Sequence, residues 1–96
     1  MYVKKHLHGG NAVLTVCDED ILGKIFENEN MKLEVSESFF GGKSVDDKEV
    51  ELLLKEFGNI NIIGKKIVKL ALNLGIVNKA DIKYVGEIPF VVIFEL

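Results

Sequence analysis

The stretch at residues 12–23 constrains the fold more than any other part of this 96-residue chain. It begins with six residues that alternate between two largely apolar faces, which is typical of a strand buried on both sides. It continues with the only cysteine, three acidic residues and a short apolar turn that ends at a glycine. We therefore expect residues 12–17 to form a central strand of a sheet, with a polar turn at its end.

Four further segments have the alternating or continuously apolar pattern that predicts strands. They are residues 2–8, 31–36, 82–85 and 90–94. Gly9, Gly10 and Asn11 separate the first of these from the central strand, and such a cluster between two strand patterns indicates a hairpin. The last segment is apolar throughout, which favours a strand that is covered on both faces.

Two segments carry the signals of amphipathic helices. In residues 47–57 apolar side chains recur every three or four positions, and Asp46 with Glu49 forms an Asp variant of the capping box at the start. In residues 62–74 a wider apolar stripe indicates burial on more than one side. Asn61 is the expected cap of this second helix.

These elements predict one α+β domain over residues 1–96. A mixed or mainly antiparallel sheet of four or five strands is covered by two main helices, at about residues 47–57 and 62–74. The predicted order is ββ, a short turn, β, αα and then ββ. The apolar surface of the second helix and of the C-terminal strand is compatible with a homodimer.

The composition narrows the classes of function. The formal net charge is −3, and all 12 basic residues are lysines. Arginine, whose guanidinium group donates two hydrogen bonds to one phosphate, is absent, and this counts against a dedicated nucleic-acid binder. Clustered lysines can still form a local positive patch. One cysteine cannot form an internal disulfide, and no stretch approaches the roughly 20 apolar residues of a membrane helix. We expect a cytoplasmic protein with no membrane partner and no cofactor.

Four short motifs occur together in an order that resembles a known family. They are V-C-D-E-D-I-L-G-K at 16–24, F-F-G-G at 39–42, N-I-I-G-K-K at 61–66 and G-E-I-P at 86–89. In this order and spacing, which cover nearly the whole chain, they resemble a small archaeal family known only as domain of unknown function 424. The resemblance implies an archaeal cytoplasmic origin and no particular activity.

The chain departs from the pattern of that family at two places. Phe40 stands where the pattern more often has tyrosine, so a role for a phenol hydroxyl does not carry over to this chain. Residues 90–92 are Phe-Val-Val, where the pattern continues with more polar side chains.

Cys17 and Asp18 are weak candidates for a catalytic pair. The dipole at the start of a helical turn would activate the thiol, whereas the adjacent acids would raise its pKa through like charge. The favoured alternative is a small buried cysteine, followed by Asp18 as the N-cap of a turn at residues 19–22. Whether the chain is an enzyme stays open, with the balance against it.

Two patterns could hold a metal ion. His6 and His8 share one face of the predicted first strand, and Asp18 or Asp20 could supply a third ligand. The acids at residues 18–20 could also bind Mg²⁺, which usually needs substrate oxygens as well. Because two histidines spaced by two are common on a solvated face, we favour that interpretation and predict no metal site.

Two further motifs are candidate binding sites. The first is a predicted loop whose aromatic faces could stack on bases; it consists of Phe39, Phe40, Gly41, Gly42 and Lys43. The second is the start of the second helix, where free N–H groups and two ammonium groups would suit a phosphate; it consists of Gly64, Lys65 and Lys66. The structural alternatives are a loop anchored in the core by one Phe, and a glycine that permits close packing while the lysines face water.

Three hypotheses for function follow. The first is a small non-enzymatic module that binds RNA or an information-processing partner through residues 39–43 together with residues 64–66. The second is a small-molecule or thiol enzyme centred on Cys17 and Asp18. The third is a protein-interaction or homodimerising subunit that uses the second helix or the C-terminal strand. We rank them in this order.

Overall fold

The computed structural model describes residues 1–95, apart from the side chain of His8, and it has the predicted α+β class. Its strands are β1 (Tyr2–His8), β2 (Asn11–Cys17), β3 (Ile25–Glu27), β4 (Lys32–Glu34), β5 (Lys43–Ser44), β6 (Asn59–Ile63), β7 (Lys83–Val85) and β8 (Ile88–Ile93). Its helices are α1 (Glu37–Phe40), α2 (Asp47–Glu56) and α3 (Lys65–Asn73), with two 3₁₀ turns, η1 (Glu19–Ile21) and η2 (Lys79–Asp81).

Six strands form one mixed sheet in the order β5-β1-β2-β6-β8-β7, and β3 pairs with β4 in a separate ribbon. Neighbours in the sheet are antiparallel except β2 and β6, which run parallel. The predicted hairpin of β1 and β2 is confirmed by its register, which pairs Tyr2 with Cys17. The prediction that β2 is a central strand is also confirmed, because Leu14, Thr15, Val16 and Cys17 are fully buried.

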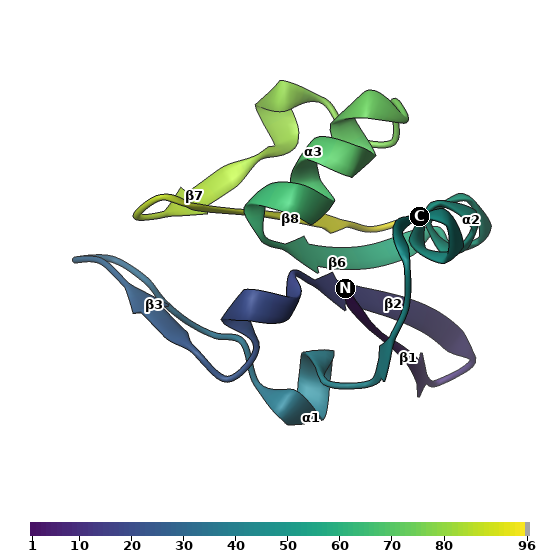
Figure 1. Cartoon of the computed structure of the whole chain (residues 1–96), viewed down its shortest axis with the longest axis horizontal. Helices are drawn as coiled ribbons and strands as arrows, with labels where there is room; N and C mark the ends of the chain where they lie inside the picture. The colour runs from purple at the N-terminus through teal and green to yellow at the C-terminus, as the bar shows by residue number, and fades with distance from the viewer. Residues whose placement is uncertain (96) are drawn as a thin grey trace.

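The sheet is covered unequally on its two faces. Helices α2 and α3 lie on one face, whereas α1 and the β3–β4 ribbon lie on the other (Figure 1). The larger core lies under the two long helices and contains Val16 and Ile62, and the smaller core contains Cys17 and Ile63. Because successive residues of a strand point to opposite faces, β2 and β6 supply both cores. The last residues of the two strands, Cys17 and Ile63, both belong to the smaller core.

Strand β6 corrects the predicted sheet and the predicted second helix. The sequence predicts a helix at residues 62–74 capped by Asn61, but β6 continues to Ile63 and α3 begins at Lys65. Pairing with β2 buries Ile60 and Ile62. Because β2 is distant in the sequence, the residues around β6 do not indicate this pairing. Strands β5 and β6 join the sheet, whereas the strand predicted at residues 31–36 forms β4 of the separate ribbon. The sheet therefore has six strands, where four or five are predicted, and the predicted order of elements is wrong.

The end of α2 and the presence of α1 also differ from the prediction. Helix α2 is confirmed with its cap, since the Asp46 carboxylate accepts from the Glu49 N–H at 2.9 Å, and it ends one residue early at Glu56. The predicted loop at residues 39–43 instead begins inside α1, because the Ser36 hydroxyl accepts from the Phe39 N–H and starts a short helix. No helix in residues 1–95 is long and apolar enough to cross a membrane.

Strand β8 is covered on one face over its whole length and on the other only at its start. Val91 is buried under the long helices, as the apolar run predicts. Val92 and Phe94 are exposed, so the prediction of a strand covered on both faces is wrong for this end. The last residue of the run, Leu96, lies outside the described residues.

Candidate functional site

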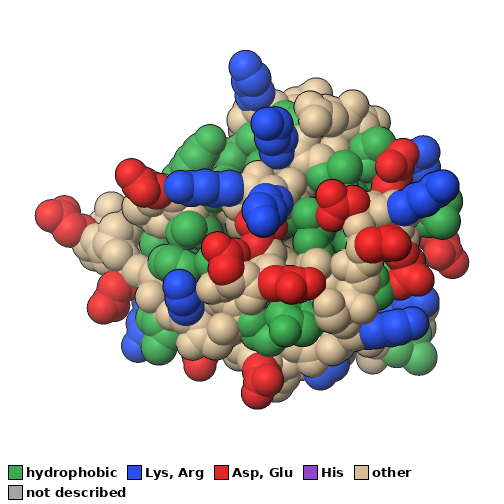
Figure 2. Space-filling view, viewed as in Figure 1, with side chains coloured by type: hydrophobic (Ala, Val, Ile, Leu, Met, Phe, Trp, Pro, Cys, Tyr) green, Lys and Arg blue, Asp and Glu red, His purple; other side chains and the backbone are tan. Residues whose placement is uncertain are grey.

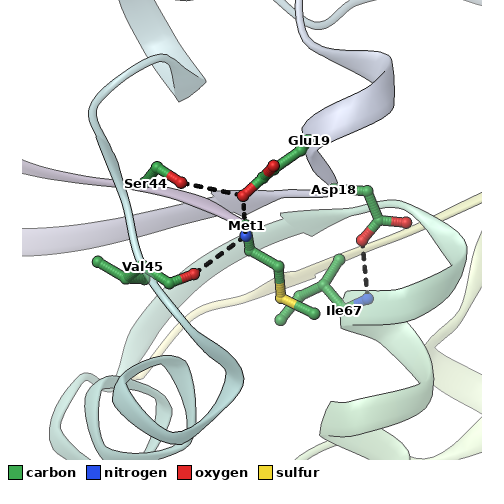
Figure 3. Close-up of polar contacts among 6 residues, drawn as sticks. All are labelled: Met1, Asp18, Glu19, Ser44, Val45 and Ile67. Carbon is green, nitrogen blue, oxygen red and sulfur yellow. Dashed lines mark hydrogen bonds and ion pairs between the residues drawn. The ribbon is translucent and has the colours of Figure 1, made fainter.

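Asp18 connects the end of β2 to the start of α3. Its carboxylate accepts from the Lys66 and Ile67 N–H groups, each at 2.9 Å, and Figure 3 shows the second of these bonds. The residue is only 4% exposed. Free N–H groups and the positive end of the helix dipole stabilise a buried carboxylate at this place. Asp18 therefore caps α3 with its side chain. It also stands at the N-cap position of η1, as predicted, but its carboxylate makes no cap bond to that turn.

Gly64 makes room for this carboxylate. Its φ is +125°, and a Cβ built on it would lie 2.4 Å from the Asp18 Cγ atom. The Gly64 N–H donates to the Pro89 carbonyl at 2.9 Å, and the Asp18 N–H donates to the Ile63 carbonyl at 3.2 Å. A side chain at residue 64 would thus meet both backbone strain and a collision, which is the close-packing role considered for this glycine.

The start of α3 differs from an open phosphate site. Two of its N–H groups, those of Lys66 and Ile67, already donate to Asp18. The side chains of Lys65 and Lys66 remain exposed. In the predicted motif at Gly64, Lys65 and Lys66, the lysine side chains are therefore accessible to a ligand. The N–H groups of Lys66 and Ile67 are already hydrogen-bonded to Asp18.

Cys17 is fully buried, as the structural alternative for it requires. Burial, followed by the charge of Asp18, raises the pKa of the thiol from 9.0 to about 11. A thiolate is the nucleophilic form of cysteine, and at neutral pH this side chain is a neutral thiol packed against Ile63 and its neighbours. Cys17 thus packs in the smaller core, and Asp18 joins the end of β2 to α3.

The acidic residues after Cys17 point to different partners. Glu19 accepts from the Met1 amino group at 3.0 Å and from the Ser44 hydroxyl at 2.9 Å, while the amino group also donates to the Val45 carbonyl (Figure 3). These two hydrogen bonds lower the pKa of Glu19, so its stabilising contribution is present at neutral pH and is lost in acid. In the described chain no three His, Cys, Asp or Glu side chains are grouped as metal ligands.

His6 holds α1 against the sheet. Its Nε2–H donates to the Phe39 carbonyl at 2.9 Å, and its ring stacks on the Phe39 ring with centroids 4.9 Å apart. The buried Thr15 hydroxyl donates to the same carbonyl at 2.6 Å. The solvated-face interpretation is therefore wrong for His6, and the side chain of His8 lies outside the described part of the structure.

The aromatic part of the first predicted binding segment lies on the face of the sheet opposite the start of α3. Phe40 is buried in the smaller core, as the anchored-loop alternative predicts, and Phe39 is partly exposed beside it. Lys43 lies in β5, opposite Val3. The helix that begins after Gly64 covers the other face, as Figure 1 shows for α1 and α3. Phe39 and Phe40 therefore do not share a face with residues 64–66, whereas Lys43 belongs to the sheet between them.

A groove between α3 and β7 contains residues that the sequence did not single out. It has a volume of about 290 Å³ and is lined by Lys65, Val68, Lys69, Leu72, Ile82, Tyr84, Glu87 and Pro89. The Tyr84 side chain is 56% exposed and projects from β7. The sequence shows two lysines four positions apart on one helix face, but it does not show that β7 lies beside them.

Together, the fold and the candidate site define a small α+β domain in which Cys17 is buried in a core and Asp18 caps a helix. The family model described as "Protein of unknown function (DUF424)" matches residues 6–96, so the chain belongs to this family and the predicted resemblance is confirmed. The crystal structure of an uncharacterized conserved protein from Methanopyrus kandleri is similar, with 25% identity and a TM-score of 0.76. That similarity covers 99% of this chain and 93% of the other. No curated protein matches the chain.

Gly64→Ala and Gly75→Ala form a matched pair that tests the fit of Asp18. Both glycines have positive φ, but a Cβ at Gly75 meets nothing within 4 Å. We expect Gly75→Ala to lower the free energy of unfolding by about 1–2 kcal/mol through strain alone. Gly64→Ala should lower it by about 3 kcal/mol or more, because loss of the cap adds to the strain. Equal losses in urea titrations would contradict the close fit.

Cys17 should resist alkylation in the folded protein. At pH 8 a pKa of about 11 leaves roughly one thiol in a thousand ionised, and burial blocks access to it. Iodoacetamide should therefore label Cys17 only in urea, whereas the exposed thiol of a Ser38→Cys variant should react at once in buffer. Because folding raises this pKa, the stability it confers is full below about pH 9 and is lost towards pH 11. Rapid native labelling of Cys17 would revive the thiol-enzyme hypothesis.

Proposed function

We propose that this chain is a non-enzymatic module that binds single-stranded RNA along α3 and β7. The observation that carries the proposal is the groove in which the exposed Tyr84 ring lies with Lys65 and Lys69. Proteins that bind single strands without sequence preference combine an aromatic face for a base with cationic side chains for the backbone. The groove offers both within one surface.

The positive charge of this surface comes from one side of α3. Lys65, Lys66 and Lys69 are all exposed, and Figure 2 shows lysine side chains gathered over this helix. The Lys65 ammonium lies 3.9 Å from the Glu87 carboxylate, with both side chains largely in solvent. Such an exposed ion pair contributes little free energy, so a phosphate can replace the carboxylate as the partner of Lys65.

Asp18 determines how a phosphate would be held here. Because its carboxylate uses the Lys66 and Ile67 N–H groups, the helix start offers little backbone to an anion. Ammonium groups on flexible stems would therefore provide the contacts, without a dedicated phosphate cradle. Binding of this kind is moderate in affinity and strongly dependent on salt.

The other predicted functions have less support. The burial of Cys17 and the capping role of Asp18 give both residues a structural reason to be present. Phe40 is buried, and the Phe39 carbonyl is occupied by His6 and Thr15, so residues 39–43 are omitted from the proposed RNA surface. The homodimer stays a prediction.

RNA binding can be tested by fluorescence anisotropy with a labelled 12-nucleotide oligouridine. If about three lysines displace counterions, the slope of log K against log salt should be about −2. Lys65→Glu with Lys69→Glu should weaken binding at least tenfold, and Tyr84→Ala should weaken it about tenfold through lost stacking. Tyr84→Phe should bind nearly as well as the original chain.

The matched control for either single variant, Lys65→Glu or Lys69→Glu, is Lys48→Glu, which makes the same charge change on α2. It should retain most of the affinity, and all variants should keep the urea midpoint expected for exposed substitutions. Equal weakening by Lys48→Glu would show attraction to net charge only. An original chain that binds no oligouridine at 20 mM salt would refute the proposal.

A further inference from the structure

Strand β1 has an outer edge that is paired only at its start. Strand β5 pairs with Tyr2 and Val3, whereas β1 continues to His8, and within the described residues no strand pairs with this side beyond Val3. The Met1 amino group donates to the Val45 carbonyl, and the Val45 N–H donates to the Met1 carbonyl. In an antiparallel ladder such pairs alternate, so every second residue of β1 directs its N–H and C=O groups outward.

Lys5 and Leu7 are the outward-directed residues of the open part. Each presents one N–H and one C=O group, which an added strand would use for four hydrogen bonds. By strand alternation their side chains share a face with that of Val3, which is buried under the long helices. Leu7 is 79% exposed at the end of this face.

A groove lies beside this open edge, between β1 and α2. Its volume is about 550 Å³, and it is lined by Val3, Lys4, Lys5, Lys43, Glu49, Leu52 and Leu53. Leu52 is 64% exposed, although it belongs to a helix whose inward residues are well buried. A strand edge next to a helix is the arrangement in which an extended peptide adds a strand and places alternate side chains on the helix.

The charge of the groove favours an acidic occupant. The ammonium groups of Lys5 and Lys43 and the carboxylate of Glu49 belong to this face, so the local charge is positive although the chain as a whole carries −3. The Lys4 ammonium donates to the Ser38 carbonyl at 2.7 Å, and the Lys5 ammonium lies 5.9 Å from the centre of the Phe57 ring. The Lys4 ammonium is therefore directed to α1 on the other face of the sheet, whereas Lys5 stays on the face of the groove. Opposite charge across an interface selects the partner and speeds association.

We propose that an acidic, extended segment of a partner protein binds in this groove by adding an antiparallel strand to β1. Its apolar side chains would cover Leu52 and Leu53, and its carboxylates would lie beside Lys5 and Lys43. The exposed leucines and the outward-directed backbone groups favour a peptide over a nucleic acid, which would use only the lysines. This proposal does not depend on RNA binding, because α3 and β7 form a separate surface.

The probe for this proposal is a labelled ten-residue peptide in which pairs of Glu alternate with pairs of Val or Ile, so that each face of the strand carries both kinds of side chain. Its reference is the same peptide with Lys in place of Glu. We expect the acidic peptide to bind at least tenfold more tightly by anisotropy. We also expect it to slow hydrogen exchange at the Lys5 and Leu7 amides, which an added strand would bond. Equal binding of the two peptides, or no binding at 1 mM, would overturn the proposal.

Two variants of Leu7 separate backbone pairing from side-chain contact. Leu7→Pro removes an N–H that points away from β2, so the hairpin is retained while the added strand loses a donor. Leu7→Ala removes the side chain and keeps the donor. We expect Leu7→Pro to bind the acidic peptide at least fivefold more weakly than Leu7→Ala. Equal affinities would rule out strand addition.

A charge variant keeps the test decisive if Leu7→Pro does not fold. Lys5→Glu should weaken binding of the acidic peptide about tenfold, whereas Lys32→Glu on the β3–β4 ribbon should leave it within about twofold. Equal effects of the two variants would contradict a specific groove. If oligouridine displaces the peptide and protects the same amides, the groove binds nucleic acid and the proposal is wrong.

Discussion

The contact between the Asp18 carboxylate and the first turn of α3 joins the end of β2 to the helix that follows β6. Strand β2 ends at Cys17, and the next residue satisfies two N–H groups of a helix that begins after β6. This bond requires a glycine at residue 64, and it fixes where α3 starts. The direction in which Lys65 and Lys66 point from the helix follows from that start.

This arrangement gives a consistent account of function. Of the two residues that could have formed a reactive pair, Cys17 is buried in the smaller core and Asp18 caps α3. The accessible features lie elsewhere, in a lysine and tyrosine groove on α3 and β7 and in a leucine and lysine groove along β1 and α2. The two proposed ligands use separate surfaces, so this small domain could hold both at once.

Features with local causes could be predicted from the sequence, and features with distant causes could not. Helix α2 follows from Asp46 and Glu49, which are three positions apart. The cap of α3 joins Asp18 to Lys66, which is 48 positions away. Because no local residue caps this helix, the sequence predicts its start at the wrong residue. The burial of Phe40 is one of the alternatives that the sequence indicates. The position of Tyr84 beside α3 depends on the packing of β7 against that helix, which the local sequence does not indicate.

The most direct test of the structural role of Asp18 is hydrogen exchange at the Lys66 and Ile67 amides of an Asp18→Ala variant. These amides lie in the first turn of a helix, where exchange is fast unless a partner accepts the hydrogen bond. The account predicts slow exchange in the original chain and exchange at least tenfold faster at both amides in the variant, with α2 unchanged. Equal exchange in the two proteins would contradict the central role of this carboxylate.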